Sequence, residues 1–170
     1  LKSQAERCKE ILLKLSKNPH NLRDNFFEKI KIVDIIKLNF EKFNTNKKLI
    51  ISNLIKGEDA RIFFKDEIMY AIGNIIQNSI IYSKTLVSVE IKILYNELII
   101  IITDDGDGFS REIIDKLGEP YVSKNKKGMG IGIFIAKNLI ENMKGSVFFH
   151  NSKENNAVVE IKFNKSILCV

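Results

Sequence analysis

The chain has 170 residues, of which 45% are hydrophobic and 28% are charged, and its formal net charge at pH 7 is +6. This composition suits one compact domain with an appended segment and argues against a chain that is disordered throughout. The basic residues are scattered along the chain, so we expect no nucleic-acid partner. The longest apolar run, residues 98–102, is far shorter than the roughly 20 residues of a membrane-spanning helix, so we expect no membrane insertion.

The two cysteines, Cys8 and Cys169, fit no metal-binding spacing and are too few for a disulfide scaffold. A reducing compartment is therefore expected, and we assign the domain to the cytoplasm. The sequence begins at Leu1, inside a helical pattern, instead of at a methionine. This predicts a piece of a longer protein, in which any inner-membrane anchor belongs to segments outside these residues.

A helix is predicted over residues 1–16. Its heptad seam consists of Leu1, Ala5, Cys8, Leu12 and Leu15. Such a seam indicates one arm of a helical hairpin or a dimer. Pro19 ends this pattern, and a second helical pattern runs over 26–43. We therefore divide the chain into a helix with its linker, residues 1–20, and a second domain, residues 21–170.

Strand and helix patterns follow one another in an irregular order through the rest of the chain. Strands are predicted over 49–55, 60–64, 87–94, 97–103, 146–150 and 157–163, and helices over 66–84 and 131–144. This order is neither a series of hairpins nor a series of βαβ units. It predicts an α+β fold, a two-layer sandwich in which helices cover one face of a mixed sheet.

The stretch "TDDGDGFS", residues 103–110, directly follows the apolar run. Alternating acidic residues near a glycine are typical of a calcium loop, but the register excludes one. With Asp105 in the first position, Phe109 falls on the fifth and Ser110 on the sixth, where glycine is needed. A plain acidic turn would explain the glycines but not their place at the end of an apolar strand, where ligand sites are common.

Asn74, Asn78 and Tyr82 lie four residues apart, along one side of the helix predicted over 66–84. The isoleucines of this helix centre well away from the asparagines, so the two amides face something other than the main core. Asparagine is a mediocre helix former, and a contact with a metal or a ligand would offset its cost. Exposure to solvent is the alternative.

Gly128, Gly130 and Gly132 alternate where the helix over 131–144 begins. Free backbone amides at a helix N-terminus can cradle phosphate groups. A dinucleotide-binding motif is excluded because no strand directly precedes these glycines. A P-loop is excluded because no glycine-lysine-serine/threonine run occurs.

In this order and spacing, the three elements resemble the GHKL ATPase superfamily, and within it the catalytic domain of bacterial sensor histidine kinases. "NIIQNSIIYS" resembles the asparagine box, "DDGDGF" the first glycine box and "GMGIGI" the second. The resemblance spans residues 24–164 and implies the Bergerat fold, with ATP and Mg²⁺ as ligands. It also implies protein-histidine kinase activity, a response regulator as partner, and a homodimer formed through the N-terminal helix.

The resemblance implies a role for each matched residue. Asp104 would accept a hydrogen bond from the adenine amino group, and Gly106 and Gly108 would let the backbone pass close beneath the base. Asn78 would ligate Mg²⁺, and Asn74 would support a metal-bound water. The residues expected near the ribose and the phosphates are Tyr82, Lys124, Gly128, Gly130 and Gly132.

Some residues depart from the kinase pattern or fall outside it. No histidine followed by an acidic residue occurs in a helix ahead of residue 20, and neither His20 nor His150 has that context. We therefore expect the phosphoacceptor histidine on another segment or chain. Ile81 occupies a position that is often basic in the family, and Asp105 and Asp107 are expected to serve the turn.

The segments "RCKEIL" and 118–141 resemble the RegB/PrrB type of redox-responsive kinases, in which an arginine-cysteine pair lies in the second helix of the dimerisation hairpin. Cys8 is then either a small apolar seam residue or a redox switch, its thiolate favoured by Arg7 and Lys9. The alternative function is another GHKL activity, such as an anti-sigma-factor serine kinase or an ATP-driven clamp. A stand-alone serine kinase would need no dimerisation hairpin.

Overall fold

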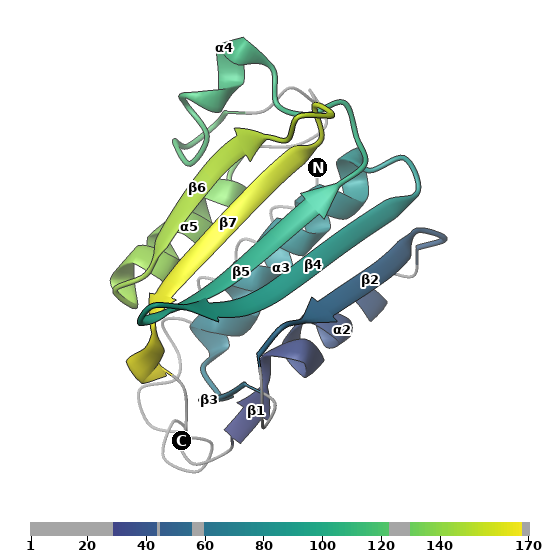
Figure 1. The fold of residues 1–170 in the computed structure, drawn as a ribbon. Coiled ribbons are helices and arrows are strands. Elements are labelled where there is room, and N and C mark those ends of the chain that lie inside the picture. The colour runs from purple at the N-terminus through teal and green to yellow at the C-terminus, as the bar shows by residue number, and fades with distance from the viewer. Residues whose placement is uncertain (1–28, 44, 56–59, 123–129, 168–170) are drawn as a thin grey trace.

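The computed structural model describes residues 29–43, 45–55, 60–122 and 130–167 (Figure 1). The elements in chain order are β1 (Lys29–Lys31), α2 (Ile32–Glu41), β2 (Lys48–Asn53), β3 (Arg61–Phe63), α3 (Asp66–Tyr82), β4 (Leu86–Leu94), β5 (Glu97–Asp104), α4 (Arg111–Ile114), α5 (Gly132–Asn142), β6 (Ser146–Asn151), β7 (Ala157–Asn164) and the short 3₁₀ helix η2 (Lys165–Ile167). The predicted helix over 1–16, with Cys8, lies outside the described residues, and so do Lys124 and Gly128.

The main sheet has five strands in the order β2-β4-β5-β7-β6. β2 is parallel to β4, and the other neighbouring strands are antiparallel. Helices α2, α3 and α5 lie against one face of this sheet, and a separate ribbon of β1 and β3 lies beside its β2 end (Figure 1). The predicted two-layer α+β sandwich with a mixed sheet is therefore confirmed.

The start of the second predicted helix is wrong. The pattern over 26–43 indicated one helix, but Lys29–Lys31 form a strand and the helix begins only at Ile32. Ile30 lies opposite Ile62 in the antiparallel pairing with β3. A Lys-Ile-Lys triplet is compatible with either period, and the pairing with a distant strand decides between them.

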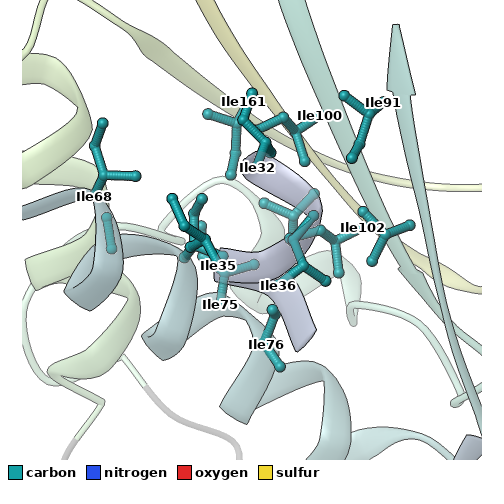
Figure 2. Packing of buried hydrophobic residues seen from close by; sticks show 14 of the residues in the cluster. Ile32, Ile35, Ile36, Ile68, Ile75, Ile76, Ile91, Ile100, Ile102 and Ile161 are labelled. Carbon is teal, nitrogen blue, oxygen red and sulfur yellow. The ribbon is translucent and has the colours of Figure 1, made fainter. Parts of the chain in front are cut away.

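Isoleucine side chains fill most of the space between the helices and the sheet (Figure 2). The largest fully buried side chains are Ile32, Ile35, Ile36, Ile68, Ile72, Ile75, Ile76, Ile91, Leu98, Ile100, Ile102 and Ile140. β-branched side chains suit strands but lose rotamer freedom in helices. Burial against the sheet, rather than intrinsic propensity, therefore stabilises α2 and α3.

The described helices are also short by membrane standards. Within the described ranges, none combines the length and the apolar character that would carry a helix across a bilayer.

Candidate functional site

Asp104 is the last residue of the central strand β5, and only 4% of the residue is exposed. Its Oδ1 accepts a 3.1 Å hydrogen bond from the backbone amide of Gly106, which is its one hydrogen bond within the described part of the chain. Burial raises the pKa of Asp104 to about 6; the Gly106 amide lowers it and the neighbouring Asp105 raises it. The second carboxylate oxygen has spare acceptor capacity, so Asp104 is suited to receive a hydrogen-bond donor from a ligand.

Two glycines shape the loop that follows Asp104. A Cβ on Gly106 would clash with the carbonyl oxygen of Tyr82 and would lie 2.7 Å from Oδ1 of Asp104. Gly108 has a φ of +73°, and a Cβ there would clash with the carbonyl oxygen of Asn155. Both glycines therefore make room for neighbouring protein backbone, whatever clearance they also give to a base.

The same loop is fastened to the β6–β7 hairpin. Asn151 accepts a 2.8 Å hydrogen bond from the backbone N–H of Phe109 and donates a 2.9 Å bond to the carbonyl of the same residue. Asn155 donates a 2.9 Å bond to the carbonyl of Asp107. The Phe109 ring packs edge-on against Phe149, with 6.1 Å between centroids. The sequence alone predicts no role for Asn151 or Asn155, because both belong to a polar connection between two strands.

Helix α3 carries three further residues of the candidate site. Asn74 donates a 2.9 Å hydrogen bond from its side-chain nitrogen to the carbonyl of Tyr70, which leaves its amide oxygen available. The Asn78 side chain is half-buried and forms no hydrogen bond with any residue that the structure describes. Tyr82 is 38% exposed. The prediction that the two amides face away from the main core is confirmed.

The start of α5 lies beside Asn74 of helix α3. A Cβ on Gly132, the first residue of α5, would lie 3.4 Å from the amide oxygen of Asn74. Gly130 has a φ of +65°, and a Cβ there would lie 2.5 Å from the carbonyl oxygen of Val122. The structure thus brings Asn74 next to Gly132, and Tyr82 next to Asp104 through Gly106. Residues predicted from separate motifs therefore meet at two positions along α3.

The amide groups on this side of α3 suit a phosphate-bound Mg²⁺. The amide oxygens of Asn74 and Asn78 are hard neutral ligands, and Mg²⁺ takes few protein ligands because it keeps waters and binds phosphate oxygens. The N-terminus of α5 carries a partial positive charge that favours phosphate groups. No cluster of three or more His, Cys, Asp or Glu side chains within the described residues is arranged to hold a metal. A metal here would depend on amide oxygens of the protein and on phosphate oxygens of a bound nucleotide.

Asp105 and Asp107 form contacts with a turn, as expected. Asp105, however, contacts a different turn from its own. Its carboxylate accepts hydrogen bonds from the connection between α3 and β4. Burial opposes its charge, yet the bonds from Thr85, Leu86 and Lys84 outweigh burial and hold the pKa of Asp105 below its ordinary value. Asp107 forms an exposed 2.8 Å ion pair with Lys84.

Comparison with known proteins now identifies the family. Residues 65–167 match the sequence model described as the histidine kinase-, DNA gyrase B- and HSP90-like ATPase. The chain belongs to this family. The matched range contains every described residue of the candidate site, from Asn74 on α3 to Gly132 on α5. ATP is therefore the ligand that the family implies for this ATPase domain.

Individual relatives narrow the similarity to histidine kinases. The sensor histidine kinase RegB of Cereibacter sphaeroides is 25% identical over 170 aligned positions, which cover 91% of this chain and 36% of that protein. The chain thus spans little more than a third of this relative's length. The mycobacterial sensor histidine kinase MprB has a TM-score of 0.69 and 16% identity, over 81% of this chain and 96% of that one.

The catalytic domain of the histidine kinase ThkA also has a TM-score of 0.69, with 18% identity over 81% of this chain and 95% of that one. At these identities the solved structures establish the fold alone. The predicted resemblance to histidine kinase catalytic domains, and to the GHKL fold, is confirmed.

Proposed function

We propose that residues 21–170 form the ATP-binding catalytic domain of a two-component sensor histidine kinase. Residues 1–20 would then be part of a dimerisation helix and its linker. The domain presents the γ-phosphate of ATP to a histidine outside residues 1–170, and the phosphoryl group passes onward to an aspartate of a response regulator. The observation that carries this proposal is the buried Asp104 carboxylate, which has spare acceptor capacity and lies next to the asparagine-bearing helix.

In this proposal Asp104 reads the base. The adenine amino group donates a hydrogen bond to the carboxylate. This bond offsets part of the free-energy cost of burying the charge. Guanine carries a carbonyl oxygen where adenine carries its amino group, so its acceptor would meet another acceptor. Asp104 therefore predicts a preference for ATP over GTP.

Asn78 holds the metal, Asn74 supports a metal-bound water, and Tyr82 lies near the ribose and phosphates. When bound, Mg²⁺ would neutralise phosphate charge. The amides at the start of α5, with Gly130 and Gly132, approach the phosphates, and the same role is proposed for Lys124 and Gly128 from the sequence alone. Phosphoryl transfer in such a site depends on positioning and charge neutralisation, not on a nucleophile from this domain.

The dimer and the redox role of Cys8 remain proposals that the heptad seam and the similarity to RegB support. A seam cysteine flanked by Arg7 and Lys9 could form an interchain disulfide under oxidation, and the bond would break on reduction. Non-reducing gels of oxidised wild type and Cys8→Ser test this. A crosslinked dimer that persists in Cys8→Ser would exclude the cysteine as the switch.

The nucleotide proposal is tested by titration calorimetry with non-hydrolysable ATP and GTP analogues, with and without Mg²⁺. Wild type should bind the ATP analogue more tightly, and Asp104→Asn should lose about ten- to a hundredfold in affinity, the cost of a hydrogen bond to a charged group. An asparagine can donate to guanine, so the variant should also lose its preference. Asp115→Asn, an exposed carboxylate near α4, is the matched control.

The metal role has its own comparison. Asn78→Ala should weaken binding mainly when Mg²⁺ is present. Failure of wild type to bind the ATP analogue, or equal affinity in Asp104→Asn, would overturn the proposal. In the longer protein that the proposal implies, acid-labile phosphate on histidine would distinguish a histidine kinase from the serine-kinase and clamp alternatives.

A further inference from the structure

The turn between α3 and β4, residues 83–85, is held by the carboxylate of Asp105, the residue that follows β5. Oδ1 of Asp105 accepts hydrogen bonds from the backbone N–H groups of Lys84 at 2.7 Å and Leu86 at 3.0 Å. Both carboxylate oxygens accept from the Thr85 N–H at 3.0 Å, and Oδ2 accepts from the Thr85 hydroxyl at 2.6 Å. One side chain therefore satisfies three successive amides.

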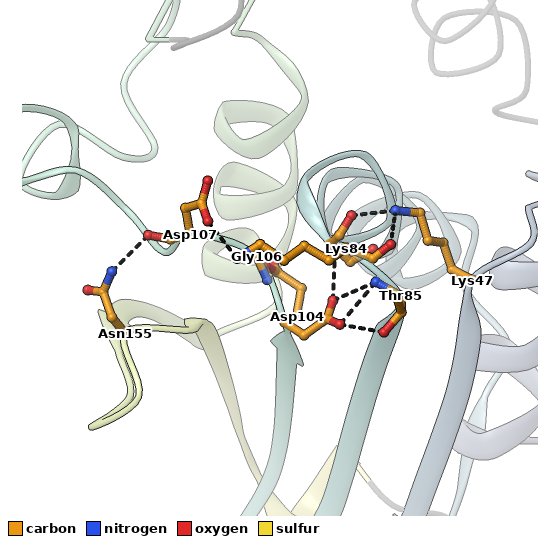
Figure 3. A network of polar contacts seen from close by, with 9 residues as sticks. Lys47, Lys84, Thr85, Asp104, Gly106, Asp107 and Asn155 are labelled. Carbon is orange, nitrogen blue, oxygen red and sulfur yellow. Dashed lines mark hydrogen bonds and ion pairs between the residues drawn. The ribbon is translucent and has the colours of Figure 1, made fainter.

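A lysine from outside the turn holds its carbonyl groups. The Lys47 ammonium, from the residue before β2, donates to the carbonyls of Ser83 and Lys84, the latter at 2.7 Å (Figure 3). The end of a helix carries partial negative charge, and α3 has no basic residue of its own in its last turn. Lys47 supplies that missing positive charge from a distant part of the sequence.

The remaining backbone groups of this turn are also paired. The Ser83 N–H donates to Ser79, the Lys48 N–H donates to the Thr85 carbonyl, and the Asp105 N–H donates to the Leu86 carbonyl, at 2.8, 2.8 and 3.2 Å. With the bonds to Asp105 and Lys47, each backbone N–H and C=O from Ser83 to Leu86 has a partner. A connection between elements is usually solvated and variable in position, whereas this one is fixed from both sides.

The position of this turn bears directly on the nucleotide site. Asp105 lies between Asp104, the proposed acceptor for adenine, and Gly106, which lies against the carbonyl of Tyr82. Tyr82 is the last residue of α3, the helix that carries Asn78. The turn therefore joins the adenine side of the site to the metal and phosphate side.

We propose that Asp105 and Lys47 are positioning residues for nucleotide binding. They touch neither base nor metal; they fix the end of α3, and with it Asn78, at the spacing from Asp104 that one ATP molecule requires. This inference rests on the proposed function. A ligand that must engage two half-sites at once loses affinity when their spacing is no longer fixed, whereas a ligand of one half-site does not.

The test compares adenosine, which reaches only the adenine side, with the Mg²⁺ complex of a non-hydrolysable ATP analogue. The affinity for the ATP complex, divided by the affinity for adenosine, should fall about ten- to a hundredfold in Asp105→Ala and Lys47→Met. This is the usual range for residues that orient a set of ligands. Asp105→Asn keeps one acceptor oxygen and should fall between these variants and wild type. The exposed Asp115→Ala and Lys48→Met are the controls, and their ratio should stay that of wild type.

All variants are measured at a temperature where thermal melts show them fully folded. If both ligands weaken by the same factor, or neither weakens, Asp105 and Lys47 only stabilise the fold and the inference is overturned. If Asp105→Ala does not fold, Asp105→Asn and Lys47→Met decide by the same ratio. If wild type binds neither ligand, the proposed function fails first and takes the inference with it.

Discussion

Gly106 lies so close to Tyr82 that a Cβ on the glycine would clash with the Tyr82 carbonyl oxygen. Neither neighbour can move freely, because Tyr82 ends the packed helix α3 and the Asp104 carboxylate, 2.7 Å from the same Cβ, ends the central strand. The absence of a side chain at position 106 is therefore what lets the helix that carries Asn78 approach the carboxylate of Asp104.

Gly106→Ala should accordingly weaken both the fold and the site. Overpacking of this kind costs about 1 to 3 kcal/mol, which urea unfolding would register as a lower midpoint. Nucleotide affinity should fall as well, because the added methyl group displaces either α3 or Asp104. Glu112→Ala, an exposed change in α4, is the control. An unchanged midpoint and affinity in Gly106→Ala would contradict the close approach.

Asp104 should make the protein less stable as the pH rises. Its pKa is about 6 in the fold against an ordinary value of 3.8, so the folded state holds this proton more tightly than the unfolded state does. The stabilising contribution is complete below pH 3.8 and is lost as the pH rises through 6. Asp104→Asn stays neutral and keeps an oxygen for the Gly106 amide, so it should exceed wild type at pH 7.5 by on the order of 1 to 2 kcal/mol.

The difference in stability between Asp104→Asn and wild type should disappear as the pH is lowered towards 4. Chemical unfolding at several pH values measures this difference. The exposed Asp115→Asn should show no comparable gap. A variant that is more stable yet binds ATP poorly is the expected signature of a residue kept for function rather than for stability. An Asp104→Asn variant that is less stable than wild type at every pH would show that the carboxylate is not disfavoured by burial.

Asn151→Ala should release the loop that follows Asp104. The side chain pairs with both backbone groups of Phe109, and the loss of two neutral hydrogen bonds costs about 2 kcal/mol. Amide hydrogen exchange at Phe109 should become faster. Asn155→Ala removes the bond to the Asp107 carbonyl and a 3.3 Å bond from Asn151, but it keeps both bonds between Asn151 and Phe109, so the Phe109 amide should stay protected. Equal protection of the Phe109 amide in wild type and Asn151→Ala would show that Asn151 does not hold this loop.

The elements that the sequence predicts well are those whose signal is local. α3 and β4 were placed within two residues of their observed ends, because each carries an apolar period of its own length. The short strand β1 was missed, because a three-residue segment acquires its state from its partner β3. Residues 103–110 are predicted to be a ligand loop because a polar, glycine-rich run ends an apolar strand, and that role stays a prediction.

The contacts that organise the site were beyond such reasoning. Lys47 reaches a carbonyl 36 residues away, Asn151 a backbone 42 residues away, and Asn155 a carbonyl 48 residues away. None of these residues carries a local pattern that distinguishes it from an ordinary polar turn residue. Their roles arise only when the sheet brings distant segments together, so one sequence without its fold leaves them unassigned.

Asn39 illustrates the same limit inside the core. It is 3% exposed, and its side-chain nitrogen donates to the carbonyl of Ile35 at 3.0 Å and, across the helix pair, to that of Met69 at 3.3 Å. A Cβ on Gly73 of α3 would lie 2.7 Å from the Asn39 amide oxygen. The polar bridge between α2 and α3 therefore requires a glycine in the middle of a helix, where glycine is normally unfavourable by about 0.5 to 1 kcal/mol.

The effect of Gly73→Ala should consequently change sign with the residue at position 39. In wild type the new methyl group displaces the buried amide and lowers the free energy of unfolding. In an Asn39→Ala background the obstruction is gone, and the gain in helix propensity, about 1 kcal/mol, should raise it. Urea unfolding of the four proteins closes a double-mutant cycle, with a coupling energy expected at about 1 kcal/mol or more. Additive effects would mean that Asn39 moves aside at no cost, and that its hydrogen bond to Met69 does not hold α2 against α3.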